Sequence, residues 1–175
     1  RDIGDEQRVE FDLANVTVYD LPYLASFLPV DAAAALLASQ LSGTLTSADG
    51  FAQYSGSPDE INRERLSDFG LNLEFVDMAV APIGSWPGVS GATGTLRMAQ
   101  DTGSLTRNST DAAVSLPAVF AAPVPLDLLA GTLIWRTTPD GLQLISDAVQ
   151  LRSASLALTG KLDLLLGGQQ GKSTI

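Results

Sequence analysis

Acidic side chains are the main groups in this sequence that could carry out chemistry. The 175 residues include 20 Asp and Glu but no His and no Cys, which removes the commonest general base, any thiol nucleophile and the usual transition-metal ligands. Pairs such as Asp12/Asp20 and Asp59/Glu60 have the residue types of a glycosidase acid and base. With this many carboxylates some such pairs are inevitable, and no pocket motif surrounds these two. The favoured interpretation is that these side chains lie on solvated sheet faces and in turns.

Two other features could bind a ligand. Residues 167–174 resemble a phosphate-binding loop, but that motif needs glycine five residues before the Gly171-Lys172 pair, where this chain has Leu166. Trp86 and Trp135 could stack on a sugar or lie at a lipid interface, although packing at the core or rim of a sheet is the favoured interpretation. The sequence therefore predicts no catalytic residue, no metal site and no cofactor.

The composition excludes some partners. A net charge of −10 and a pI of about 4.2 leave no basic stripe for phosphates, so nucleic acid is not expected as a partner. Hydrophobic residues make up 45% of the chain and charged residues only 17%, so disorder is not expected and a large apolar surface must be covered. No apolar run reaches the roughly 18 residues that would span a bilayer as a helix.

The elements that would carry these residues are mainly strands. Alternation over residues 7–19 and 69–83 predicts two long strands, and each changes parity, near Asn15 and near Val76, which indicates β-bulges in a sheet that bends. One or two short helices are predicted near residues 21–41. Residues 43–54 have a weaker pattern that fits a strand or a loop. Further strands are predicted at 91–100, 103–115, 128–137, 142–150 and 153–166, with a three-proline corner at 116–125.

This pattern predicts a long, curved antiparallel sheet with one apolar face. Candidates for that face are Val9, Phe11, Leu13, Leu45, Leu71, Leu73, Phe75, Leu96, Leu133, Trp135, Leu142, Leu144, Leu156, Leu158 and Leu162. An antiparallel sheet can leave one face in water, but one short helix cannot cover the other face of seven or eight long strands. That face must close on itself, pair with a second sheet or bind something apolar.

The order of several motifs resembles the AsmA-like superfamily, and specifically its YhdP branch of large envelope proteins. The matching segments are Trp86-Pro-Gly-Val-Ser-Gly91, Gly94-Thr-Leu96, Leu116-Pro-Ala-Val-Phe120, Pro123-Val-Pro-Leu-Asp127 and Gly131-Thr-Leu-Ile-Trp135. Family members are many times longer and carry an N-terminal transmembrane anchor, so the resemblance implies that residues 1–175 are one segment of a larger, repeating β-groove protein. Within it, residues 7–54 would form a strand–helix–strand unit and residues 68–166 an antiparallel meander.

The same resemblance implies a function. It implies a non-catalytic hydrophobic groove for phospholipid acyl chains, in the bacterial periplasm, tethered to the inner membrane by a segment outside this chain. The remainder of the same long chain or neighbouring envelope proteins would be its protein partners.

Two alternatives remain open from the residues alone. The first is a closed β-sandwich or scaffold module of the envelope that binds no lipid. The second is a carbohydrate-active β domain, which would need two facing carboxylates roughly 5–9 Å apart in a cleft near Trp86 or Trp135.

Overall fold

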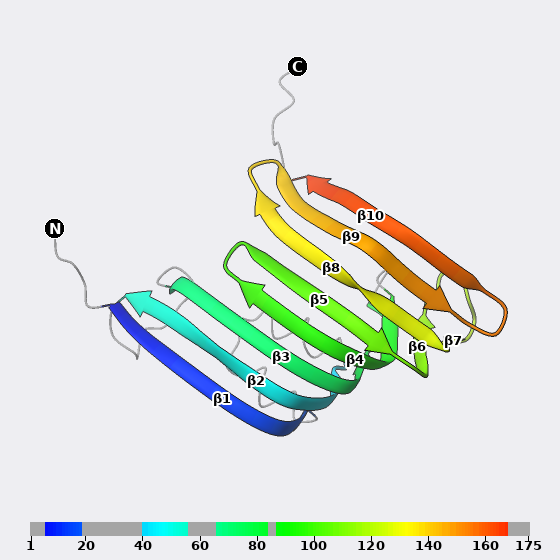
Figure 1. Ribbon diagram of the computed structural model, residues 1–175, viewed down its shortest axis with the longest axis horizontal. Helices are drawn as coiled ribbons and strands as arrows, with labels where there is room; N and C mark the ends of the chain where they lie inside the picture. The colour runs from blue at the N-terminus through cyan, green and yellow to red at the C-terminus, as the bar shows by residue number, and fades with distance from the viewer. Residues whose placement is uncertain (1–5, 19–39, 56–65, 84–86, 168–175) are drawn as a thin grey trace, which may run out of the picture.

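The computed structural model describes residues 6–18, 40–55, 66–83 and 87–167, and these form one open antiparallel sheet of ten strands (Figure 1). Eight of the strands follow one another in the order β1-β2-β3-β4-β5-β8-β9-β10, and the short β6 and β7 branch off from β4. The strands are β1 (Glu6–Val18), β2 (Ser42–Ser55), β3 (Leu66–Val80), β4 (Gly88–Ala99), β5 (Thr102–Ser109), β6 (Ala112–Ser115), β7 (Val124–Leu126), β8 (Leu128–Thr138), β9 (Gly141–Arg152) and β10 (Ala157–Gly167).

The prediction of a mainly β fold with one antiparallel sheet is confirmed. The helices predicted near residues 21–41 fall almost entirely outside the described residues, and the described part contains no helix. The division into units at 7–54 and 68–166 stays a prediction.

The main departures from the predicted strands lie in three places. The predicted strand 103–115 is two strands, β5 and β6, because the backbone turns at Asp111, where φ is 63°. The predicted strand 153–166 begins only at Ala157, because residues 153–156 form a turn in which the Ser153 amide donates to the Leu156 carbonyl at 2.8 Å. The proline corner contains β7, and Pro125 fits there because β7 pairs only with β6 and lies at an edge.

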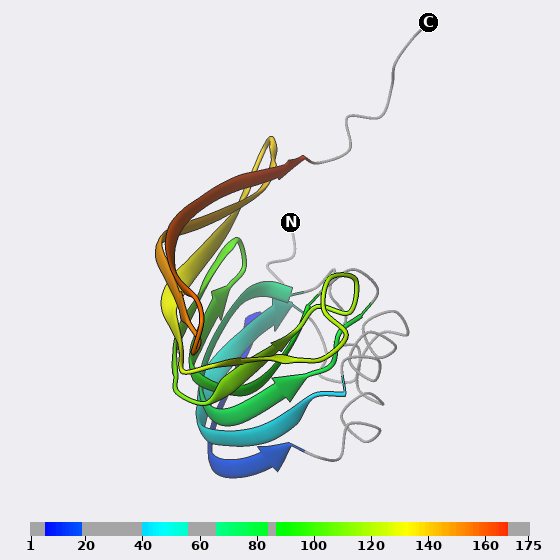
Figure 2. The ribbon, with the colours of Figure 1, turned by 90° about the vertical axis from the view of Figure 1, so that its right-hand side faces the viewer.

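Backbone irregularities cross the sheet at one level. Asn15 in β1 and Asp77 in β3 have φ of 55° and 53°, values that a strand residue adopts at a bulge, and both lie beside the parity changes seen in the sequence. Register shifts follow between β2 and β3 beside Leu45, between β8 and β9 after Gly131, and between β9 and β10 after Gly160. These irregularities lie near one level of the sheet, and Figure 2 shows that the sheet is curved.

The small buried core lies at the corner where β6 and β7 leave the main sheet. Ala112, Leu126 and Leu129 are buried there, with Val114 and Leu151 packed against them. Elsewhere in the described residues few large apolar side chains are buried, which leaves one face of the sheet to be explained.

Candidate functional site

The strand register divides the side chains into two faces, because directly opposite partners in an antiparallel pair point the same way. One unbroken row of such partners crosses all eight strands of the main path. It consists of Phe11, Gly50, Leu71, Met98, Gly103, Trp135, Leu144 and Leu164. Every side chain in this row is apolar or absent. We call the face that carries this row the leucine face.

A second row of the leucine face runs parallel to the first across six strands. It consists of Leu13, Ala48, Leu73, Leu96, Leu105 and Leu133. All fifteen residues predicted for the apolar face lie on the leucine face except Leu156, which lies in the turn before β10 and is 58% exposed. The prediction omitted Phe69, Met98, Leu105, Leu164 and Leu166, although each follows the alternation of its own strand.

Two aromatic rings on the leucine face lie beside glycines of the neighbouring strand and fill the space next to them. A side chain built at Gly50 would meet the ring of Phe11, with its Cζ at 2.9 Å, and one built at Gly103 would overlap the indole of Trp135. The missing side chains therefore make room for the rings beside them.

The apolar side chains are most exposed at the two outer strands. In β1, Val9 and Leu13 are each 49% exposed, and in β10 Leu158 is 50% exposed. The corresponding leucines of the central strands, such as Leu96 and Leu133, are half-buried by their neighbours. The apolar surface thus continues to both edges of the described sheet.

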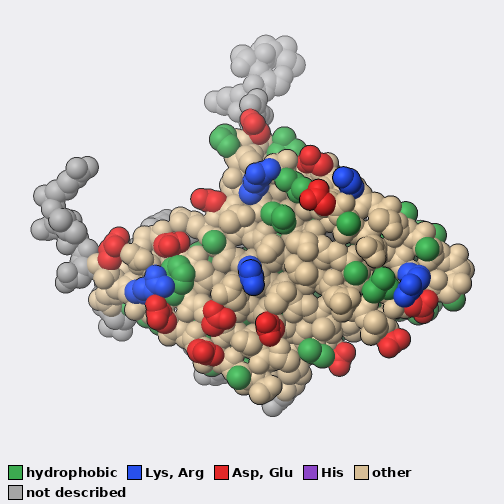
Figure 3. Space-filling view, viewed as in Figure 1, with side chains coloured by type: hydrophobic (Ala, Val, Ile, Leu, Met, Phe, Trp, Pro, Cys, Tyr) green, Lys and Arg blue, Asp and Glu red, His purple; other side chains and the backbone are tan. Residues whose placement is uncertain are grey.

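The opposite face is mainly polar, and it is the outer side of the curved sheet. Its central row is Asp12, Asp49, Asn72, Arg97, Ser104, Ile134, Ile145 and Asp163. Figure 3 shows acidic and basic side chains scattered over the side of the molecule that faces left, outside the hollow of the sheet, in Figure 2. The leucine face is therefore the inner, concave one.

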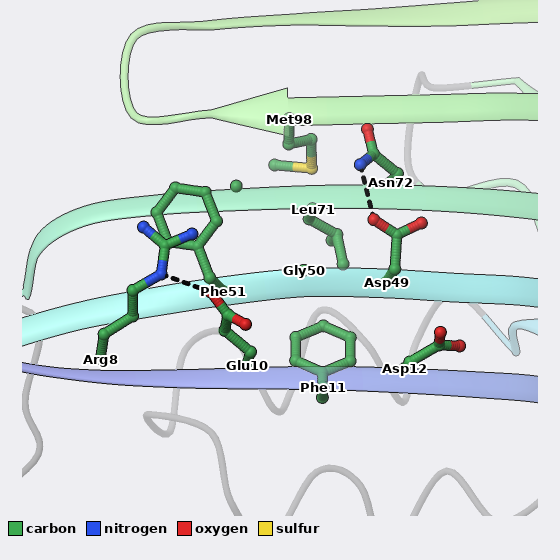
Figure 4. A pocket seen from close by; sticks show the side chains of 11 residues that line it. Arg8, Glu10, Phe11, Asp12, Asp49, Gly50, Phe51, Leu71, Asn72 and Met98 are labelled. Carbon is green, nitrogen blue, oxygen red and sulfur yellow. Dashed lines mark hydrogen bonds and ion pairs between the residues drawn. The ribbon is translucent and has the colours of Figure 1, made fainter.

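A hollow of about 490 Å³ is lined by residues of β1–β4 from both faces of the sheet (Figure 4). They include Arg8, Glu10 and Asp49 of the polar face and Phe11, Leu71 and Met98 of the leucine face, and they have no features of a catalytic site. Arg8 lies 3.7 Å from the centre of the Phe51 ring and pairs with Glu10 at 2.7 Å. Asp49 accepts a 2.8 Å hydrogen bond from Asn72. These contacts satisfy one another as on an ordinary solvated sheet surface, and such exposed pairs contribute about 0–1 kcal/mol.

One charged side chain departs from this division. Arg107 in β5 is opposite Gly94 in β4 and Gly131 in β8, which places it on the leucine face. Burial lowers the pKa of its guanidinium from the ordinary value, and no hydrogen bond or ion pair to another described side chain holds it. A small cavity of about 20 Å³ joins it to Ser146, which is 2% exposed and whose hydroxyl has no hydrogen-bond partner.

A family model described as YhdP protein matches residues 2–173, which is almost the whole chain. The chain belongs to the YhdP family. No curated protein and no solved structure gives a significant match.

The described part of this YhdP-family chain lacks the features of a metal site, a membrane-spanning helix and a carbohydrate site. Its residues contain no group of three or more acidic side chains arranged to hold a metal ion. None of its elements is a helix long and apolar enough to cross a membrane. Asp12 and Asp49, which the register brings together, lie on the polar face, whereas Trp135 lies on the leucine face and Trp86 falls outside the described residues. The arrangement required of a carbohydrate site is therefore not found there.

Proposed function

We propose that the leucine face binds the acyl chains of phospholipids and that the chain is a non-catalytic segment of a lipid-transfer protein of the bacterial envelope. The observation that carries this proposal is the apolar row that crosses all eight strands of the main path without a polar side chain. Membership of the YhdP family supports it, because a lipid-transport role in the envelope is associated with that family.

The length of the row suits a sliding lipid. Seven steps between the eight strands, of about 4.8 Å each, make the row roughly 34 Å long. An acyl chain occupies about half of a 30 Å bilayer core, so the row is about twice as long as one chain. A lipid could then move along the row while staying in contact with apolar side chains throughout.

The driving force would be burial of acyl CH₂ groups, about 0.8 kcal/mol for each one removed from water. Because the sheet is open, headgroups can remain in water at the open side while the tails cover the leucine face. The rings of Phe11 and Trp135 occupy the space beside Gly50 and Gly103, so they add to the apolar surface that the tails would contact.

The proposal extends to the setting of this segment. We place it in the periplasm, in a longer chain that is tethered to the inner membrane, with further groove segments of that chain or neighbouring envelope proteins as partners. The exposed apolar surface at β1 and β10 supports this, since a groove that continued past either edge would cover Leu13 or Leu158.

A photocrosslinking experiment with neighbouring residues as controls tests the lipid proposal. A photoreactive amino acid at Leu133 or Leu73 would point onto the leucine face, whereas one at Thr132 or Asn72 would point to the polar face from the same strands. We expect phospholipid adducts from the first two positions at least about tenfold above the second two. Equal adducts from both faces, or none from Leu133 and Leu73, would refute lipid binding and favour a scaffold role.

A further inference from the structure

Arg107 is the only charged side chain that the register of the described strands places on the leucine face. Its row consists of Val16, Leu45, Phe75, Gly94, Arg107, Gly131, Val149 and Gly160. The flanking positions, Gly94 and Gly131, have no side chain, so a long guanidinium stem has room to lie along the sheet surface.

This charge has no counter-ion within the described sheet. The carboxylates whose register is given, among them Glu74, Asp49 and Asp163, point to the opposite face. A partly buried guanidinium without an anionic partner is costly, because the protein replaces only part of the hydration that the charge loses. An apolar residue at this position would avoid that cost. The position is therefore suited to an anionic group that belongs to a ligand and pairs with Arg107 when the ligand binds.

Ser146 is a second, independent observation at the same place. Its hydroxyl is buried without a partner, which is unusual because buried polar groups nearly always form hydrogen bonds. It borders the cavity of about 20 Å³ that Arg107, Gly131 and Leu133 also line. A space of this size accepts one water molecule or one oxygen atom of a larger group.

We propose that Arg107 and Ser146 form a binding position for a phosphate oxyanion on the leucine face, which contacts the phosphodiester of a lipid whose tails lie along the apolar rows. Guanidinium groups bind phosphate oxygens through paired, charge-assisted hydrogen bonds, and the hydroxyl donates one more to the oxygen that enters the cavity. This inference rests on the proposed lipid function. It adds a preference for phosphate-bearing lipids over neutral lipids with the same tails.

The overall charge makes such a position useful. The chain carries a net charge of −10, which repels anionic headgroups at long range. A single cation within the groove gives the phosphate one favourable contact, and one contact of this kind is weak enough to be released as the lipid moves on.

The test compares two lipids with identical acyl chains. The full chain with a photoreactive amino acid at Leu133 is mixed with vesicles that contain equal amounts of phosphatidylglycerol and diacylglycerol, and mass spectrometry measures the ratio of the two adducts. We expect the wild-type ratio to favour phosphatidylglycerol by about tenfold or more, as hydrogen bonds to a charged group allow. Arg107→Met should bring the ratio to about one, and Arg107→Lys should leave it intermediate.

Two further variants separate this position from general effects. Ser146→Ala keeps the charge and should lower the ratio by several-fold, whereas Arg97→Met removes a cation from the polar face and should leave it unchanged. A ratio that persists in Arg107→Met, or that falls equally in Arg97→Met, would overturn the phosphate position while leaving lipid binding intact. If neither lipid forms adducts in any variant, the proposed function itself fails.

Inorganic phosphate distinguishes a lipid-borne phosphate from a free one. An excess that leaves the wild-type ratio unchanged supports the lipid headgroup as the source of the oxyanion. If inorganic phosphate at the same concentration as the lipid phosphate instead brings the adduct ratio to about one, the position binds free phosphate. That result would overturn the lipid part of the proposal.

Discussion

Alanine at Gly94 should destabilise the sheet far more than alanine at Gly160, although both glycines occupy the same row of the leucine face. A Cβ at Gly94 would overlap the Thr106 carbonyl oxygen and approach the Arg107 Cα to 3.1 Å. Both obstacles are backbone atoms of β5, so no side-chain rotation relieves the clash. A Cβ at Gly160 meets nothing within 4 Å.

The expected magnitude follows from these two environments. Overpacking against fixed backbone costs about 1–3 kcal/mol, because β4 and β5 must move apart. In an open position the alanine instead gains about 0.5–1 kcal/mol, because glycine loses more conformational freedom on folding. The two variants should therefore differ by about 2–4 kcal/mol, or roughly 5–15 °C in Tm for a chain of this size.

Thermal and urea unfolding of the full chain, followed by circular dichroism, measure this difference. Gly160→Ala is the matched control, since it makes the same chemical change on the same face. If Gly94→Ala melts within about 1 °C of Gly160→Ala, β4 and β5 do not approach as closely as the structure shows, and the register that defines the leucine face loses its main support.

Three other outcomes are expected. Leu96→Asp should reduce phospholipid that co-purifies with the chain by about tenfold or more, because a carboxylate enters the inner face, whereas Thr95→Asp on the outer face should have little effect. Ser109→Ala should cost about 1–3 kcal/mol in urea unfolding and speed amide exchange at Thr93, since it removes hydrogen bonds of 2.8 and 3.2 Å to that residue. Asn15→Val should lower stability by about 1–2 kcal/mol in the same assay, because a β-branched residue fits poorly at a φ of 55°, and Asn15→Gly should not.

The apolar face was predictable because alternation is a local property. Val9, Phe11 and Leu13 share a face through the period of two residues alone, and the parity changes near Asn15 and Val76 indicated the bulges that the backbone forms there. The Thr138–Gly141 connection was likewise found from turn chemistry within four residues.

The rows across the sheet were not predictable, because register joins residues far apart in the chain. Nothing near Gly103 indicates that Trp135 will lie over it, and nothing near Arg107 indicates that glycines will flank it on both sides. In the sequence Arg107 is an ordinary polar residue that follows Leu105 in the alternation. Leu156 was predicted on the apolar face but lies in the turn before β10. Hydropathy alone cannot distinguish an apolar residue in a tight turn from one in a strand.

The alignment of the bulges gives the sheet different stiffness in its two directions. Along a row, hydrogen-bonded strands at a fixed spacing resist stretching, so the length of the groove is set by the number of strands. Along the strands, the bend is concentrated at one level, where Asn15, Asp77 and Gly131 adopt positive φ. Small backbone rotations at this line would open or narrow the hollow while the ladders on either side keep their pairing. The number of strands therefore fixes the length of the sheet along its rows, whereas the backbone angles at this line set its curvature.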